Sequence, residues 1–117
     1  LWGIAFKPDT DDIREAPALF LVNELLKAGA KISAYDPEAM NNVKKVYDNK
    51  VSFGKDHYEV LKGADALVIC TEWAVFRTPD FDEMKKLMKS KLIFDGRNLY
   101  RNEQMKQLGF IYSSIGR

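Results

Sequence analysis

The sequence predicts an α/β protein, a Rossmann-like, doubly wound domain with a mainly parallel sheet and helices on both faces. Short apolar runs bounded by turn residues alternate along the chain with segments whose apolar residues recur at helical spacing. The runs are nearly continuous, which is typical of strands buried on both faces of a parallel sheet. The chain has 117 residues, 46% of them apolar and 30% charged, which suits one globular domain.

The chain opens on a buried-strand pattern, the apolar run at residues 1–6. This run is too short for a helix, and it ends at Lys7-Pro8 because proline cannot continue a strand ladder. An acidic loop at residues 9–12 follows and leads to Arg14, which precedes the first expected helix. The pattern therefore brings a lysine to the carboxyl end of a strand and an arginine just beyond it.

The next segment predicts a strand–helix–strand unit. Residues 17–28 have a stripe of Leu and Val at helical spacing, with Pro17 in the first turn and Gly29 at the left-handed position that ends a helix. Residues 31–35 then form a strand that stops at Asp36. A helical crossover of this kind joins two parallel strands.

The rest of the chain continues the alternation of strands and helices. The apolar run at 64–71 is the clearest strand after the first, and residues 73–77 are expected to form a helical turn. Further strands are expected at 50–53, 92–94 and, at the edge of the sheet, 110–112; further helices are expected at 38–47, 56–61, 81–89 and 101–108.

Charge and cysteine content exclude several classes of function. The net charge is only +1, so the chain has no global field to attract nucleic acid or an anionic membrane, and any anion site must be local. The sequence shows no signal peptide and no bilayer-spanning stretch. Cys70, the one cysteine, cannot form an internal disulfide, so we expect a cytoplasmic protein. Leu1 already lies in a strand pattern, and the sequence is expected to be a piece of a longer chain.

A local anion site is predicted at the carboxyl edge of the sheet, where open α/β sheets bind their ligands. Lys7, Arg14 and Arg97 lie near this edge and could together hold a diphosphate, with the Arg97 guanidinium binding as a bidentate fork. Gly96 would let the backbone approach a ligand, or is a plain turn glycine. Alternatively, Lys7 and Arg14 are solvated charges paired with nearby acids.

The usual dinucleotide-binding fingerprint is missing, because no glycine-rich turn follows the first apolar run. Asp36 lies where a ribose-binding acid would lie, but Asp-Pro after a strand is also a common turn. His57, the only histidine, is expected to be exposed, and no metal site is expected. Cys70 fits a small core residue better than a nucleophile. The chain alone is therefore not interpreted as a standard NAD cradle.

Four motifs resemble the carboxy-terminal, UDP-binding domain of the UDP-glucose/GDP-mannose dehydrogenase family. Their order and spacing match that domain over essentially the whole chain. The Asp-Gly-Arg-Asn version of the last motif is most similar to family members that oxidise UDP-glucose. The motifs are GIAFKPDTDDIRE at 3–15, AYDP at 34–37, TEW at 71–73 and FDGRN at 94–98.

The resemblance implies that residues 1–117 are the UDP-sugar-binding domain of a longer dehydrogenase. Members of this family also have an amino-terminal NAD-binding domain and a central helix used in dimerisation. They oxidise the sugar C6 alcohol to a carboxylate with two NAD, through a cysteine. The expected partners are therefore a UDP-sugar, the protein's own amino-terminal domain and a second copy.

The resemblance also implies roles for individual residues. Phe6 and Lys7 would contact the UDP-sugar, Arg97 its phosphate or sugar region, and Arg14 the NAD across the domain interface. No catalytic residue is expected within 1–117, because Cys70 lies in the wrong motif and domain, so the chain alone is expected to be inactive.

Other interpretations remain open at this stage. The substrate could be UDP-N-acetylmannosamine or another nucleotide sugar. Because no complete catalytic set is present, the chain could also be a non-catalytic nucleotide-binding or assembly domain. A phosphoacceptor receiver-like domain fits the alternation, but here the acidic cluster follows the first apolar run only after Lys7-Pro8.

Overall fold

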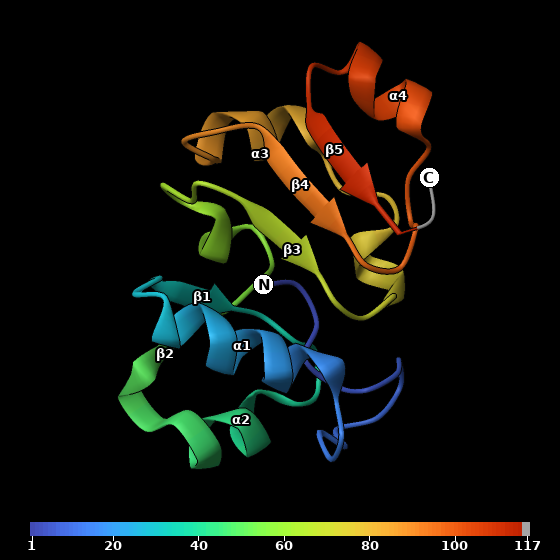
Figure 1. Cartoon of the computed structure of the whole chain (residues 1–117). Coiled ribbons are helices and arrows are strands. Elements are labelled where there is room, and N and C mark those ends of the chain that lie inside the picture. Colours follow the sequence, from blue (N-terminus) through green and yellow to red (C-terminus); the bar gives the residue numbers. More distant parts are fainter. Residues whose placement is uncertain (116–117) are drawn as a thin grey trace.

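Short parallel strands form the centre of the computed structural model, which describes residues 1–115 (Figure 1). They are β1 (Ile32–Ala34), β2 (Val51–Phe53), β3 (Leu67–Ile69), β4 (Leu92–Asp95) and β5 (Ile111–Ser114). β1 pairs with β2, and β4 lies between β3 and β5. The opening segment joins the two sheets, because Trp2 bridges both Tyr35 and Ile69 in parallel. The order β2-β1-opening segment-β3-β4-β5 is that of a doubly wound Rossmann fold.

The opening segment is a much shorter strand than the sequence predicts. A strand over residues 1–6 was expected, but only Trp2 takes part in the ladder. At Gly3 the backbone has φ +88°, and a Cβ atom there would lie 2.6 Å from the Cβ of Thr71. The chain therefore turns out of the sheet at Gly3, although residues 2–5 are buried as expected.

The helices follow the predicted order with slightly tighter bounds. They are α1 (Pro17–Lys27), α2 (Met40–Tyr47), α3 (Phe81–Leu87) and α4 (Asn102–Gln107). Gly29 follows α1 with φ +86°, the left-handed conformation that glycine adopts without strain. Asp80 caps the start of α3, because its carboxylate accepts a hydrogen bond from the backbone N–H of Glu83 (3.1 Å).

Two elements differ from the expected secondary structure. The helix expected at 56–61 is a single 3₁₀ turn, Glu59–Leu61. The strand expected at 64–71 is shortened to β3, because Ala64 belongs to the preceding turn: its N–H donates to Leu61 and its carbonyl accepts from Lys89. The hydrogen bonds of this turn therefore keep Ala64 out of the strand, although the sequence there is mostly apolar.

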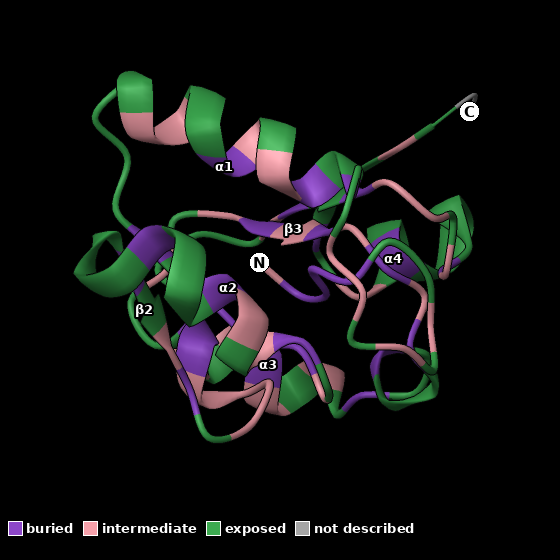
Figure 2. Ribbon diagram, turned by 90° about the horizontal axis from the view of Figure 1, so that it is seen from below, coloured by how far each residue is buried: buried purple, intermediate pink, exposed green. Residues whose placement is uncertain are grey.

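Two apolar clusters lie around the strands. One contains Trp2, Phe76, Ile93 and residues of α3 and α4, whereas the other contains Ile4, Ala34 and residues of α1 and α2. α1 and α3 lie on opposite sides of β3 (Figures 1 and 2), and the buried residues of the helices face inward (Figure 2). The predicted doubly wound class, with helices on both faces, is therefore confirmed.

The helices of the described residues are short. α1, at 11 residues, is the longest among residues 1–115, and none of the described helices is long and apolar enough to cross a bilayer.

Candidate functional site

The candidate site is built around the turn at Gly3–Phe6, where the chain leaves the sheet at its carboxyl edge. The backbone N–H groups of Ile4 and Ala5 donate to one oxygen of Asp36, at 2.7 and 2.9 Å. The Thr71 hydroxyl donates to the carbonyl of Ala5 at 2.6 Å. The Arg97 guanidinium donates to the carbonyl of Phe6 at 3.3 Å. Side chains that follow β1, β3 and β4 thus hold this turn.

Arg97 is oriented before any ligand binds. Its Nε donates to the carbonyl of Cys70 at 2.8 Å, and its Nη1 lies 3.6 Å from a carboxylate oxygen of Glu72. The side chain remains 29% exposed. Because a guanidinium carries five N–H groups, N–H groups remain for an anion beyond the contacts to Phe6, Cys70 and Glu72.

The turn that carries Arg97 is also held rigidly. The buried carboxylate of Asp95 accepts from the backbone N–H of Arg97 (2.9 Å), from that of Leu99 (2.7 Å) and from the Tyr112 hydroxyl (2.6 Å). Gly96 lies against β3, where a Cβ atom would lie 3.0 Å from the carbonyl oxygen of Ile69. Of the two expected roles for Gly96, the structure supports the turn glycine, whose close approach is to the neighbouring strand.

Phe6 and Lys7 project from the held turn. Phe6 is 39% exposed, Lys7 is exposed, and the Lys7 ammonium lies 5.5 Å from the centre of the Phe6 ring. Within residues 1–115, no carboxylate lies within ion-pair distance of Lys7. Lys7 forms no direct ion pair among these residues, although its charge contributes to the lowered pKa of Asp12.

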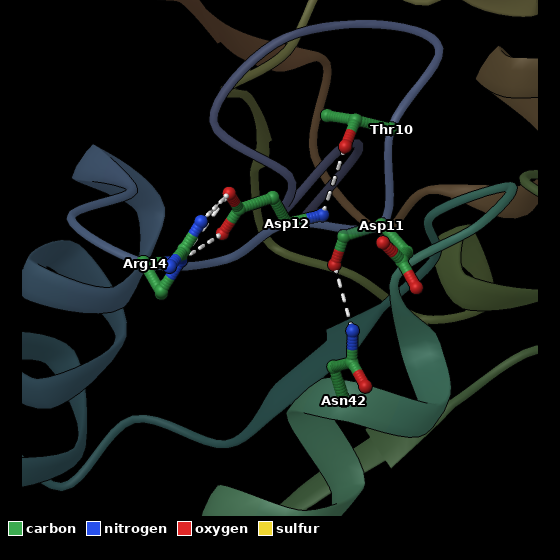
Figure 3. A network of polar contacts seen from close by, with 5 residues as sticks. All are labelled: Thr10, Asp11, Asp12, Arg14 and Asn42. Atoms are coloured by element: carbon green, nitrogen blue, oxygen red, sulfur yellow. Dashed lines mark hydrogen bonds and ion pairs between the residues drawn. The ribbon is translucent and has the colours of Figure 1, made fainter.

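Arg14, in contrast, is paired locally (Figure 3). Its guanidinium donates to both carboxylate oxygens of Asp12, at 2.9–3.3 Å, and its backbone N–H donates to the same carboxylate. These hydrogen bonds lower the pKa of Asp12 to about 2. Thr10 and Asn42 hold the loop through the Asp12 N–H and the Asp11 carbonyl. The structure thus places Arg14, 87% exposed, in an ion pair beside the turn and not in contact with Arg97.

Asp36 does not have the role of a ribose-binding acid. It is fully buried, and besides the turn it accepts from the N–H groups of Glu38 and Ala39 at the start of α2 (2.9 and 2.8 Å). The indole N–H of Trp73 also donates to it, at 3.2 Å. With five donors on one carboxylate, Asp36 organises the turn that Asp-Pro predicts.

The remaining candidate groups have structural roles. Burial raises the pKa of the Cys70 thiol to about 11, as suits an inert core residue. His57 was expected to be exposed, but it is half-buried against the ring of Trp2, 5.1 Å away, and desolvation lowers its pKa. Among residues 1–115, no group of His, Cys, Asp and Glu side chains could hold a metal ion.

Two hollows of the surface are not lined by Lys7, Arg14 or Arg97. A groove of about 730 Å³ lies at the opposite, amino-terminal edge of the sheet and is lined by apolar residues including Leu1, Leu25 and Leu67. A smaller hollow of about 470 Å³ lies at the carboxyl edge, beside Trp73, and is lined by three acids, Asp9, Asp11 and Glu38. A phosphate would be repelled there, so the cations mark the candidate anion site.

The family comparison agrees with this geometry. The model of the UDP-glucose/GDP-mannose dehydrogenase family, UDP binding domain, matches residues 1–102. The chain belongs to this family. Its predicted resemblance is therefore confirmed, and the receiver-like alternative is wrong.

Two curated relatives carry the same activity in their names. The UDP-glucose 6-dehydrogenase of Pseudomonas aeruginosa is 48% identical over 100% of this chain and 27% of its own length. The UDP-glucose 6-dehydrogenase of Rhizobium meliloti is 48% identical over 98% of this chain and 26% of its own length. The chain thus spans about a quarter of the length of these UDP-sugar dehydrogenases.

Solved structures in the family match the fold closely. An NDP-N-acetyl-D-galactosaminuronic acid dehydrogenase from Methanosarcina mazei has a TM-score of 0.81 and 32% identity, covering 99% of this chain and 24% of its own. A UDP-D-ManNAc dehydrogenase from Pyrococcus horikoshii has a TM-score of 0.79 and 32% identity with the same coverage.

The sequence interpretation gave Asp36 and Thr71 no part in holding the turn of the candidate site. Asp36 and Thr71 lie directly after β1 and β3, and both side chains bind the turn that carries Phe6. The available signal was positional, because both residues are polar and follow apolar strands at the same edge. Their hydrogen bonds, to residues 31–32 and 66 positions away, are not encoded in any local pattern.

Proposed function

We propose that residues 1–117 form the UDP-sugar-binding domain of a longer UDP-glucose 6-dehydrogenase, which oxidises UDP-glucose to UDP-glucuronate with two NAD. The observation that carries this proposal is the pre-oriented Arg97 guanidinium, held at the carboxyl edge of the sheet beside Phe6 and Lys7. Relatives that are 48% identical and named UDP-glucose 6-dehydrogenase support the choice of sugar.

The proposed roles follow from charge and exposure. Arg97 and Lys7 would offset the charge of the diphosphate, with Arg97 binding through charge-assisted hydrogen bonds. The exposed ring of Phe6 would pack against the nucleotide or sugar. Arg14 would reach NAD across a domain interface, because its guanidinium is exposed and fixed by Asp12 beside the candidate site.

The backbone amides of the turn at Gly3–Phe6 are not free to act as an NAD cradle. In a dinucleotide-binding turn, backbone N–H groups after the first strand face the pyrophosphate. Here the N–H groups of Ile4 and Ala5 donate to Asp36, and that of Phe6 donates to the Asp12 carbonyl. NAD would therefore be bound mainly by the rest of the protein.

The reaction also needs groups from outside this chain. Oxidation of an alcohol to a carboxylate removes four electrons and so reduces two NAD to two NADH. The proposed nucleophile is a cysteine of the amino-terminal domain, since Cys70 is half-buried and desolvation raises the pKa of its thiol to about 11. Closure of the two domains on the UDP-sugar would exclude bulk solvent from the oxidation steps, while one water is consumed to form the carboxylate. We also propose a homodimer of the full-length protein, located in the cytoplasm.

The proposal is tested by the NADH yield of the full-length protein with UDP-glucose or UDP-N-acetylmannosamine. Two NADH per UDP-glucose, with little from the acetylated sugar, is the expected result. Activity only on UDP-N-acetylmannosamine would contradict the sugar, and the Pyrococcus horikoshii structure makes this the alternative substrate. No NADH from either sugar, in a folded protein, would favour a non-catalytic nucleotide-binding domain.

A further inference from the structure

We propose that Thr71 and Asp36 are positioning residues of the UDP-sugar site, which hold the Gly3–Phe6 turn so that Phe6 and Lys7 face the ligand. The inference rests on the proposed function, because it takes Phe6 and Lys7 as ligand contacts. Neither Thr71 nor Asp36 would touch the ligand itself, since both side chains are fully buried.

The turn needs such support because it is buried but lies outside the sheet. The chain leaves the ladder at Gly3, whereas Ile4 and Ala5 stay almost completely buried. Buried backbone N–H and carbonyl groups must find partners, and here the ladder does not supply them. The Asp36 carboxylate accepts hydrogen bonds from the N–H groups of Ile4 and Ala5, and the Thr71 hydroxyl donates one to the carbonyl of Ala5. The path of the backbone just before Phe6 is therefore set by two side chains.

Thr71 fits its position in both shape and chemistry. A Cβ atom at Gly3 would lie only 2.6 Å from the Cβ of Thr71, so the two residues can pack this closely because Gly3 has no side chain. Its hydroxyl is the donor to the Ala5 carbonyl, at 2.6 Å. Serine could keep this hydrogen bond, whereas valine has nearly the same shape but has no donor.

Asp36 extends the support to the second side of the site. Besides the hydrogen bonds from the turn, Asp36 accepts one from the indole N–H of Trp73. Glu72, the residue before Trp73, forms an ion pair with Arg97. Arg97 in turn donates to the carbonyl of Phe6. Arg97 and the backbone that carries Phe6 and Lys7 are thus linked through hydrogen bonds and the Glu72–Arg97 ion pair.

The first test is Thr71→Val in the full-length protein, with the Kd of UDP measured by calorimetry and steady-state constants measured alongside. Without the donor, the Ala5 carbonyl is buried and unsatisfied, so the turn shifts. We expect the Kd of UDP and the KM of UDP-glucose to rise roughly tenfold while the KM of NAD stays unchanged, as small displacements are costly at a binding site. Thr71→Ser should restore both constants.

A matched control removes a buried hydroxyl elsewhere. Tyr47→Phe loses the hydrogen bonds to the Leu19 carbonyl and to Asn23, between α2 and α1. It should lower the unfolding midpoint without changing the KM of UDP-glucose. Equal effects of Thr71→Val on the KM of UDP-glucose and of NAD, or failure of Thr71→Ser to rescue, would overturn the positioning role.

A milder pair of variants decides the question if Thr71→Val does not fold. Trp73→Phe removes one donor from Asp36, and Trp2→Phe removes an indole N–H that donates instead to the His57 carbonyl (2.7 Å). Only Trp73→Phe is expected to weaken UDP binding. Equal UDP affinity in both folded variants would overturn the inference.

Lys7→Ala and Arg97→Ala, measured in parallel, separate this inference from the proposed function. If these two variants weaken UDP binding and Thr71→Val does not, the site is supported and the positioning role is wrong. If Lys7→Ala and Arg97→Ala both bind UDP like the wild type, the site itself is wrong, and the positioning role is wrong with it.

Discussion

Arg97 combines several contacts that are usually found on different residues. It binds two backbone carbonyls, those of Cys70 and Phe6, and pairs with Glu72, yet it remains partly exposed. Fixing a guanidinium in advance reduces the entropy that ligand binding must remove. Its energetic contribution to nucleotide binding should therefore exceed that of an ordinary surface arginine.

Arg97→Ala in the full-length protein should raise the Kd of UDP about tenfold or more, because a hydrogen bond to a charged group contributes about 1.5–3 kcal/mol. Arg77→Ala is the matched control, since it removes the same charge from an exposed position after the Ala74–Phe76 turn. Calorimetric titration with UDP measures both variants. Equal affinities for UDP would contradict the role of Arg97.

Asp12 gives a prediction that depends on pH. Its carboxylate is held ionised by Arg14, which lowers the pKa in the folded protein to about 2, compared with about 3.9 in an unfolded chain. Its contribution to stability is therefore present above pH 4 and is lost as the pH falls towards 2.

NMR titration of the Asp12 carboxyl should show a midpoint near 2, and Arg14→Ala should move that midpoint back towards the ordinary value. Because both side chains are solvent-accessible, added salt should weaken the shift. A midpoint near 4 in the wild type would show that the ion pair does not form in solution.

At the scale of elements, α3 shows how a short helix depends on the residue that caps it. Its seven residues, Phe81–Leu87, follow Asp80, whose carboxylate caps the N–H of Glu83. Asp80→Ala should lower the free energy of unfolding by about 1 kcal/mol, as is usual when a capping side chain is lost.

Asp82→Ala is the control, because Asp82 also lies in the first turn of α3 but is exposed and pairs only loosely with Lys85 (3.7 Å). Its loss should cost less, about 0.3–0.5 kcal/mol. Urea unfolding monitored by circular dichroism would measure both variants. Equal destabilisation would show that the cap of Asp80 adds nothing beyond its charge.

The elements also show what a sequence can and cannot predict. Apolar periodicity and turn residues predict the strand and helix order, and Gly29 ends α1 as expected. The same apolarity overextends the opening strand, because nothing in the run at 1–6 indicates that Gly3 adopts a positive φ against Thr71.

Some features of the candidate site can likewise be predicted from the sequence, and others cannot. The carboxyl-edge rule predicts Lys7 and Arg97, because it depends only on where strands end. The pairing of Arg14 with Asp12, two residues away, was one of the open alternatives, whereas no sequence rule predicts that Asp36 gathers donors from residues up to 37 positions away. Those depend on the packing of distant segments, which no local pattern contains.

At the scale of the whole molecule, the opening segment lies at the centre of the strand order and its continuation carries Phe6 and Lys7. One side of the proposed binding site is complete within the described residues: Arg97, Lys7 and the held turn. We expect the groups for NAD binding and the nucleophile to come from the rest of the protein, because the Ile4 and Ala5 amides are occupied by Asp36 and the half-buried thiol of Cys70 has a raised pKa. Folding and catalysis should therefore be separable.

Residues 1–117 produced alone should give a folded domain that forms no NADH from UDP-glucose and NAD. The physical reason is that a thiol whose pKa is near 11 supplies almost no thiolate at neutral pH, and no backbone cradle faces a pyrophosphate. Circular dichroism and a cooperative unfolding transition would establish folding, and the full-length protein in the same assay would be the positive control. NADH formation by the isolated domain at a rate near that of the full-length protein would show that this chain holds catalytic groups of its own.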